Sequence, residues 1–118
     1  MSKKSLIAQG DALFAAYFHD LYNQCAVEGC NNPCELAHLI PRGHHLFRWD
    51  RRNVLPLCGW HHKYSLILSC HGSPEAFQEW LKQNHPAKYI FWADHKNQVG
   101  YSIPEYWYRE QIEAMKKW

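Results

Sequence analysis

The sequence of 118 residues lacks any apolar run of the roughly 18 residues that a transmembrane helix needs, and its basic start is not followed by a signal-peptide core. It also lacks internal repeats, low-complexity segments and an evident linker. These absences predict a single small domain spanning residues 1–118, in a soluble protein of the cytoplasm. With 6 Trp, 7 Tyr and 5 Phe the chain can pack a core, although a modest one that a metal ion would help to stabilise.

Strong charge is absent as well, since the formal net charge is only +2. The flanks are balanced, so the surplus lies within residues 38–63, where Asp50 is outnumbered by Arg42, Arg48, Arg51, Arg52 and Lys63. A local cationic patch suits a phosphodiester substrate and makes these five residues candidates for contacts to DNA. The alternative is an ordinary solvated loop.

The five cysteines are an odd number, which in a reducing compartment favours metal binding over disulfides. Cys25 with Cys30, and Cys58 with His61, have the spacing of two ligand pairs for a structural, tetrahedral zinc ion. Cys34 could replace one member of the first pair, but Gly29 supplies a turn that favours Cys25 and Cys30. We expect Cys70 to be a buried or free thiol.

Three polar residues, His38, Asn53 and His62, lie between or beside these zinc ligands. The segments AHLIPRG, LFRWDRRN and VLPLCGWHH that carry them resemble the motif of the HNH (ββα-metal) endonucleases, in particular the phage recombination nucleases of the NinG/Rap-like branch. The resemblance covers about a third of the chain. It implies an α+β fold, with a small ββα-metal core stapled by the structural zinc and flanked by N-terminal and C-terminal helices.

The resemblance also implies a catalytic role for each of the three residues. His38 would be the general base, because an imidazole can accept a proton near neutral pH. His62 would bind a catalytic divalent ion, Mg²⁺ or Mn²⁺, and Asn53 would tie the loop across its own backbone. Many HNH nucleases carry a metal ligand directly before the base, where this chain has Ala37. Asp50 is the nearest acid that could fill the gap, and His44 and His45 are further possibilities.

Periodicity and turn residues predict the elements around the motif core of residues 25–70. Helices are expected over about 11–22, with Asp11 as the N-cap, and over 73–84 and 104–117. Residues 35–40 and 53–57 are expected to form two strands joined by the loop 42–52. A third helix should open near Cys58 and run toward Ser69. In the loop, Trp49 is expected to pack rather than to stack on a base, and Arg48 with Asp50 could instead shape the loop as an ion pair.

The function that follows is divalent-metal-dependent hydrolysis of DNA, in phage or prophage recombination or DNA processing, with branched or single-strand-containing DNA as the implied substrate. A non-catalytic zinc-knuckle module that binds DNA is the alternative, and Ala37 is the feature that supports it. A purely structural zinc protein would neither bind nor cut DNA. The sequence leaves a monomer and a homodimer equally open.

Overall fold

The computed structural model describes residues 2–98 and 102–118 and begins with the long helix α1 (Lys3–Leu21). Ser2 caps this helix, because its hydroxyl accepts a hydrogen bond from the backbone N–H of Ser5. Leu6, Gly10, Phe14 and Phe18 recur every fourth residue and form its buried face. The prediction that Asp11 caps a helix over 11–22 was therefore wrong about the start, and Asp11 lies within the helix.

A short antiparallel hairpin, β1 (Glu35–His38) and β2 (Val54–Leu57), forms the centre of the molecule. Its register pairs Glu35 with Leu57 and His38 with Val54. All four residues of β2 are buried, as a strand between two layers of side chains must be. The hairpin confirms the predicted strand pair, with each strand shorter than the predicted range by one or two residues.

The helix predicted from Cys58 toward Ser69 is shorter than expected, since only a π-helical turn forms over Trp60–Tyr64. Ser65 ends the turn: its hydroxyl accepts hydrogen bonds from the backbone N–H groups of Ile67 and Leu68. A serine side chain that offers such local partners competes with helical hydrogen bonding. Leu66 and Ile67, taken as part of a helix stripe, are each 85% exposed.

Three further helices complete the described chain: α2 (Pro74–Asn84), α3 (Pro86–His95) and α4 (Glu105–Met115). The first and last confirm the helices predicted over 73–84 and 104–117. The sequence analysis did not predict α3. Pro86, which ends α2, occupies the first turn of α3, where a missing N–H costs nothing.

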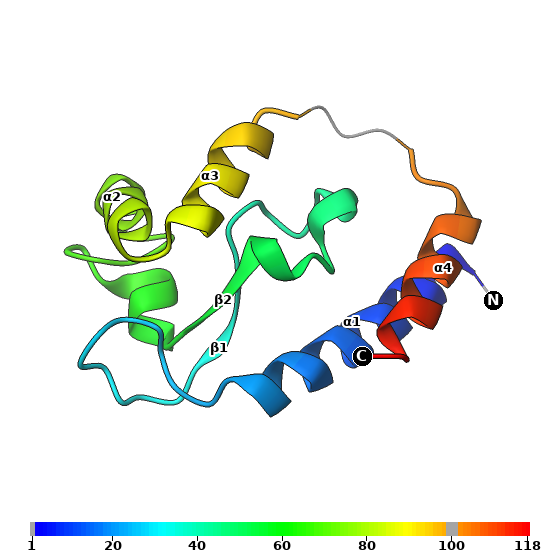
Figure 1. Cartoon of the computed structure of the whole chain (residues 1–118), viewed down its shortest axis with the longest axis horizontal. Helices are drawn as coiled ribbons and strands as arrows, with labels where there is room; N and C mark the ends of the chain where they lie inside the picture. The colour runs from blue at the N-terminus through cyan, green and yellow to red at the C-terminus, as the bar shows by residue number, and fades with distance from the viewer. Residues whose placement is uncertain (1, 99–101) are drawn as a thin grey trace.

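Figure 1 shows how these elements surround the hairpin. α1 and α4 lie side by side at one end of the molecule, with both termini, and α2 and α3 pack together at the other. The α1–α4 pair shares a core with Trp49 of the loop between the strands, whereas the hairpin shares a second core with Phe77 and Leu81 of α2. No helix in the described ranges has the length and apolar character that crossing a membrane requires.

Candidate metal centre and active site

A cluster of one imidazole and three thiols joins the segment before β1 to the segment after β2. Cys25 and Cys30 come from the turn before β1, and Cys58 and His61 follow β2 directly. Gly29 lies between the first two with φ of 80°, a conformation that glycine adopts without strain. The backbone N–H of Ala26 donates to Pro56 O at 2.8 Å, which fixes the first turn against β2.

The spacing of these four donor atoms fits a tetrahedral zinc ion. All four lie within 4.8 Å of one another. His61 Nδ1 is 3.4 Å from Cys25 Sγ and 3.3 Å from Cys58 Sγ, and Cys30 Sγ is 3.9 Å from Cys58 Sγ. Tetrahedral zinc bonds would put sulfur and nitrogen about 3.5 Å apart, and two sulfurs about 3.8 Å apart. The three pair distances are close to these values, so the four residues could hold a zinc ion.

The remaining cysteines lie outside the cluster. Cys34 directs its thiol to the carbonyl of Tyr22 at 3.6 Å, so the ligand set contains Cys25 and not Cys34. Cys70 is a partly buried free thiol, and burial raises its pKa to about 11. Burial also raises the pKa of Cys25 to about 11, so its thiolate form at neutral pH depends on a bound cation.

His38 ends β1, and a backbone carbonyl holds its ring in place. Nε2 lies 2.8 Å from Arg48 O, so this nitrogen carries the proton and donates it, and the lone pair of the neutral ring is on Nδ1. The carbonyl belongs to the loop after β1. Burial lowers the pKa of His38, and the charges of Arg42 and Arg48 act in the same direction. The ring is therefore neutral, and able to accept a proton, at physiological pH.

Asn53 is fully buried and fixes both ends of the loop that follows β1. Its Oδ1 accepts from Ile40 N at 2.7 Å, and its Nδ2 donates to Ile40 O and Phe47 O, each at 3.0 Å. All the polar atoms of the amide are thus used by backbone groups, which leaves none for a metal ion. This arrangement holds Arg48, and with it the carbonyl that orients His38.

His62 lies in the π-helical turn and contacts an acid that the sequence analysis did not single out. Its Nδ1 donates to Glu35 Oε1 at 2.6 Å, and the Glu35 side chain is 45% exposed. Lys63 Nζ approaches the same carboxylate at 3.9 Å. The register of the hairpin and the Cys/His cluster bring Glu35 and His62 together. Their separation in sequence therefore follows no motif spacing from which the contact could be predicted.

One cavity of about 630 Å³ brings the base and the expected metal ligand together. Its polar lining consists of Glu35, His38, Arg42, His62, Lys63, His71 and Gln78. The ring of His71 lies 4.9 Å from that of His62. Imidazoles, a carboxylate and two cations around one hollow are the groups that metal-assisted hydrolysis of a phosphate ester uses.

Asp50, suggested as a ligand of the divalent ion, lines a different cavity, with Trp49 and Trp107. Its carboxylate is engaged by Arg52, whose Nε and Nη2 donate to it at 3.0 and 2.7 Å, and whose backbone N–H donates at 2.9 Å. Burial raises the pKa of Asp50, but these hydrogen bonds outweigh that effect and lower it. The structure does not bring Asp50 to His62.

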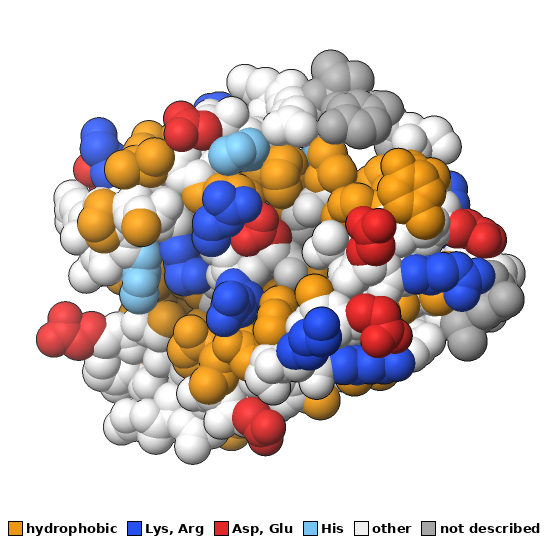
Figure 2. All heavy atoms as spheres, turned by 45° about the vertical axis from the view of Figure 1, so that its right-hand side comes forward, with side chains coloured by type: hydrophobic (Ala, Val, Ile, Leu, Met, Phe, Trp, Pro, Cys, Tyr) orange, Lys and Arg blue, Asp and Glu red, His pale blue; other side chains and the backbone are white. Residues whose placement is uncertain are grey.

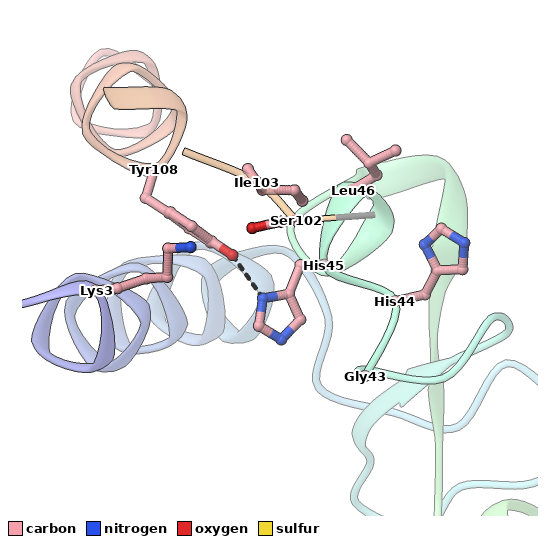
Figure 3. A pocket seen from close by; sticks show the side chains of 8 residues that line it. All are labelled: Lys3, Gly43, His44, His45, Leu46, Ser102, Ile103 and Tyr108. Atoms are coloured by element: carbon pink, nitrogen blue, oxygen red, sulfur yellow. Dashed lines mark hydrogen bonds between the residues drawn. The ribbon is translucent and has the colours of Figure 1, made fainter. Parts of the chain in front are cut away.

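His44 and His45, the other suggested ligands, also have partners elsewhere. His44 Nε2 lies 2.8 Å from Gln98 O, and His45 Nδ1 lies 2.7 Å from the Tyr108 hydroxyl. Both histidines line a separate cavity of about 410 Å³, and Figure 3 shows His45 pointing toward Tyr108 there. Neither residue lines the cavity of His38 and His62.

The five candidate DNA contacts differ in how free their charges are. Arg48 is held by Asp11 through two hydrogen bonds, of 2.8 and 2.6 Å, and its side chain is only 14% exposed. Arg52 pairs with Asp50, and Arg51 lies over the rings of Tyr17 and Trp118. Arg42, which also contacts Asp11, and Lys63 line the cavity of His38. Figure 2 shows Lys and Arg side chains across the middle of one face, with acidic side chains between them.

Trp49 is 6% exposed and stacks on Trp107, which confirms that it packs. Its indole N–H donates to Asp11 at 2.9 Å. The alternative prediction, an ion pair between Arg48 and Asp50, was wrong: Arg48 pairs with Asp11, and Asp50 pairs with Arg52.

Residues 25–65 match the protein-family model described as HNH endonuclease. The matched segment contains the four cluster residues, both strands, His38, Asn53 and His62. Searches of curated proteins and of solved structures gave no match to the chain. The expected fold class is confirmed by the mixture of helices with a two-stranded sheet and by a Cys/His cluster that could bind zinc. The family match over residues 25–65 indicates nuclease activity on nucleic acid.

Proposed function

We propose that this protein is a divalent-metal-dependent endonuclease that hydrolyses phosphodiester bonds of DNA. The observation that carries the proposal is the shared cavity of His38 and His62, with Arg42 and Lys63 in its lining. A positioned base, a metal-binding imidazole and cations beside the phosphate are the minimum that this reaction needs. The match of residues 25–65 to the HNH endonuclease model supports the same chemistry.

His38 acts as the general base in this proposal. Its Nε2–H is bound to Arg48 O, so Nδ1 is the nitrogen that takes a proton from water. As that proton leaves, the water oxygen bonds to phosphorus and the bond from phosphorus to the leaving sugar oxygen breaks. The lowered pKa of His38 keeps the ring unprotonated before the step.

The other residues hold the substrate and the geometry. A divalent ion, Mg²⁺ or Mn²⁺, bound through His62, would polarise the phosphate and stabilise the leaving oxygen. Arg42 and Lys63 contact phosphate oxygens from the cavity wall, and Asn53 keeps the loop in place through its three backbone contacts. The cluster of Cys25, Cys30, Cys58 and His61 binds a structural zinc ion that supports the hairpin.

The substrate proposed by resemblance is branched or single-strand-containing DNA, as in phage or prophage recombination. The loop from Arg48 to Asn53 supports this, since its sequence resembles that of the NinG/Rap-like nucleases. Cleavage of a four-way junction and of a linear duplex of the same sequence tests the preference. Equal rates on the two substrates would contradict it.

The decisive experiment compares nicking of supercoiled plasmid with Mg²⁺ or Mn²⁺ by the native protein and by His38→Ala, at equal zinc content. We expect cutting to need the ion and to fall about 10²-fold to 10⁴-fold in the variant. His19→Ala, which removes an exposed imidazole of α1, is the matched control and should cut normally.

A second function, DNA binding without catalysis, has one observation in its favour. Ala37, at the place of a usual metal ligand, is fully buried and has no donor atom. If the native protein binds DNA but does not cut it with either ion, the binding module replaces the nuclease.

A further inference from the structure

The contact between Glu35 and His62 joins two elements at the edge of the cavity. Glu35 opens β1 opposite Leu57, and His62 follows β2 by one turn. Glu35 Oε1 and His62 Nδ1 are 2.6 Å apart, and His62 is largely covered, with a side chain 12% exposed. The carboxylate is half exposed and borders the hollow, so solvent and ions can reach it.

Glu35 lies on the same face of β1 as Ala37, because side chains two residues apart in a strand point the same way. Ala37 packs on Leu55 and Leu57 and offers no ligand. This face of β1 therefore has no metal ligand at Ala37, but it carries the carboxylate of Glu35 two residues earlier, next to His62.

The oxygen and nitrogen donors that the sequence suggested as ligands have other partners. Asp50 is bound by Arg52 and lines another cavity, and His44 and His45 contact Gln98 and Tyr108. Within residues 2–98 and 102–118, Glu35 is the acid that contacts His62. Mg²⁺ and Mn²⁺ prefer oxygen ligands, so a site built on His62 needs such a group.

Resting on the proposed nuclease function, we propose that Glu35 and His62 together bind the catalytic divalent cation, with Glu35 supplying the oxygen ligand that Ala37 does not. Adjacent ligands of an octahedral ion with bonds of about 2.1 Å are roughly 3.0 Å apart. The 2.6 Å contact must therefore open by about 0.4 Å, a small shift for an exposed glutamate. Lys63, 3.9 Å from Glu35, offsets part of its charge in the free protein.

The two ways in which Glu35 could serve the ion are separable. As a ligand it donates a carboxylate oxygen to the cation; as a positioning residue it only accepts the Nδ1–H of His62. Glu35→Gln keeps an amide oxygen that can accept this hydrogen bond but removes the anionic ligand. The glutamine variant therefore tests the ligand role itself.

The experiment measures Mn²⁺ binding to zinc-loaded protein by titration calorimetry, together with nicking of plasmid by the same samples. We expect Glu35→Gln and His62→Ala each to weaken Mn²⁺ binding by at least about tenfold. Glu79→Gln, which removes an equal charge from the exposed face of α2, should bind Mn²⁺ like the native protein. Zinc content and thermal unfolding verify that each variant is folded.

The outcomes separate the ion site from the nuclease. If Glu35→Gln binds Mn²⁺ as tightly as the native protein, the proposed ligand role is overturned, whatever the nicking rates. If Mn²⁺ binding depends on Glu35 but the native protein does not cut DNA, the ion site stands and the nuclease function fails.

Discussion

At the scale of single residues, His38 combines a fixed orientation with a shifted proton affinity. Burial and the two neighbouring arginines hold its pKa below the ordinary value of 6.5, against the opposing effects of Arg48 O and Asp11. Because the neutral ring is the active form of a base, the nicking rate should rise with pH through a midpoint below 6.5 and be level near pH 7. A pH profile of the rate with plasmid saturating tests this. A midpoint above pH 6.5 would mean that the rise in rate reports the titration of a group other than His38.

Gly10 is a residue whose role depends on packing rather than on chemistry. A Cβ built on it would lie 2.0 Å from Cζ2 of the Trp49 indole, so the helix and the loop meet where no side chain fits. Gly10→Ala should lower the free energy of unfolding by about 1–3 kcal/mol, because the packed indole of Trp49 must shift to make room for the methyl group. Urea unfolding of the zinc-loaded protein measures it. Gly43→Ala, with nothing within 4 Å of its Cβ, should stay within about 0.5 kcal/mol.

Some residues of the site could be found from the sequence and others could not. Cys25, Cys30, Cys58 and His61 follow from ligand spacing together with the turn at Gly29, which favoured Cys25 over Cys34. Glu35 could not be found in this way, since it meets His62 only through the hairpin register. Asp50 was the nearest acid in sequence, yet Arg52, two residues later, binds it locally.

At the scale of elements, the cluster of Cys25, Cys30, Cys58 and His61 lies at the end of the hairpin away from His38. A two-stranded hairpin is marginal on its own, so the cluster should stabilise the whole segment. Cys58→Ser should therefore lose zinc and lower the melting temperature, and cleavage should be lost with the fold. Circular dichroism and zinc analysis measure both effects.

Cys34→Ser is the matched control for that variant, because the Cys34 thiol points at Tyr22 O and not at the cluster. It should keep one zinc ion per chain and melt like the native protein. Loss of zinc in this control, with retention in Cys25→Ser, would exchange the two cysteines in the ligand set.

Asp11 of α1 makes several of the contacts that join this helix to the loop after β1. Asp11 accepts hydrogen bonds from Arg48, Trp49 and Arg42, and the carbonyl of Arg48 holds His38. Asp11→Asn should cost about 1–3 kcal/mol of unfolding free energy, because charged hydrogen bonds are lost, and should slow nicking by loosening the base. Asp20→Asn, at the exposed end of α1, should do neither. Unchanged nicking in a destabilised Asp11→Asn protein would show that the tie serves folding alone.

The predictability of the elements follows from how locally each is determined. α2 and α4 carry their own start signals and apolar stripes, so the sequence analysis found both within two residues. α3 was missed because Pro86 is at once a stop for α2 and a first-turn residue of α3. The start of α1 was missed because Asp11 resembles an N-cap in the sequence. Its carboxylate instead accepts hydrogen bonds from two residues far away in the chain, Arg48 and Trp49.

At the scale of the whole molecule, the positive charge that residues 38–63 can offer to DNA is smaller than their number of arginines suggests. Asp11 neutralises Arg48 and Asp50 neutralises Arg52, and both acids also shape the loop. Partners at a distance in sequence cannot be read from charge counts, so the sequence did not reveal Asp11 as the partner of Arg48. The folded protein leaves Arg42 and Lys63 beside the cavity, and these two should carry most of the phosphate binding there.

Salt dependence of DNA binding tests that division of the charges. Each phosphate contact contributes a slope of about 0.9 to the plot of log affinity against log salt concentration, because binding releases counterions. Arg42→Gln and Lys63→Gln should each reduce the slope by about 1. Lys116, whose ammonium group pairs with Glu113 of α4, provides the control, and Lys116→Gln should leave the slope unchanged. Fluorescence anisotropy with a labelled duplex in Ca²⁺, over a range of salt concentrations, measures the slopes without cleavage. If all three variants change the slope alike, DNA contacts the protein broadly, and the cavity of His38 is not where its phosphates concentrate.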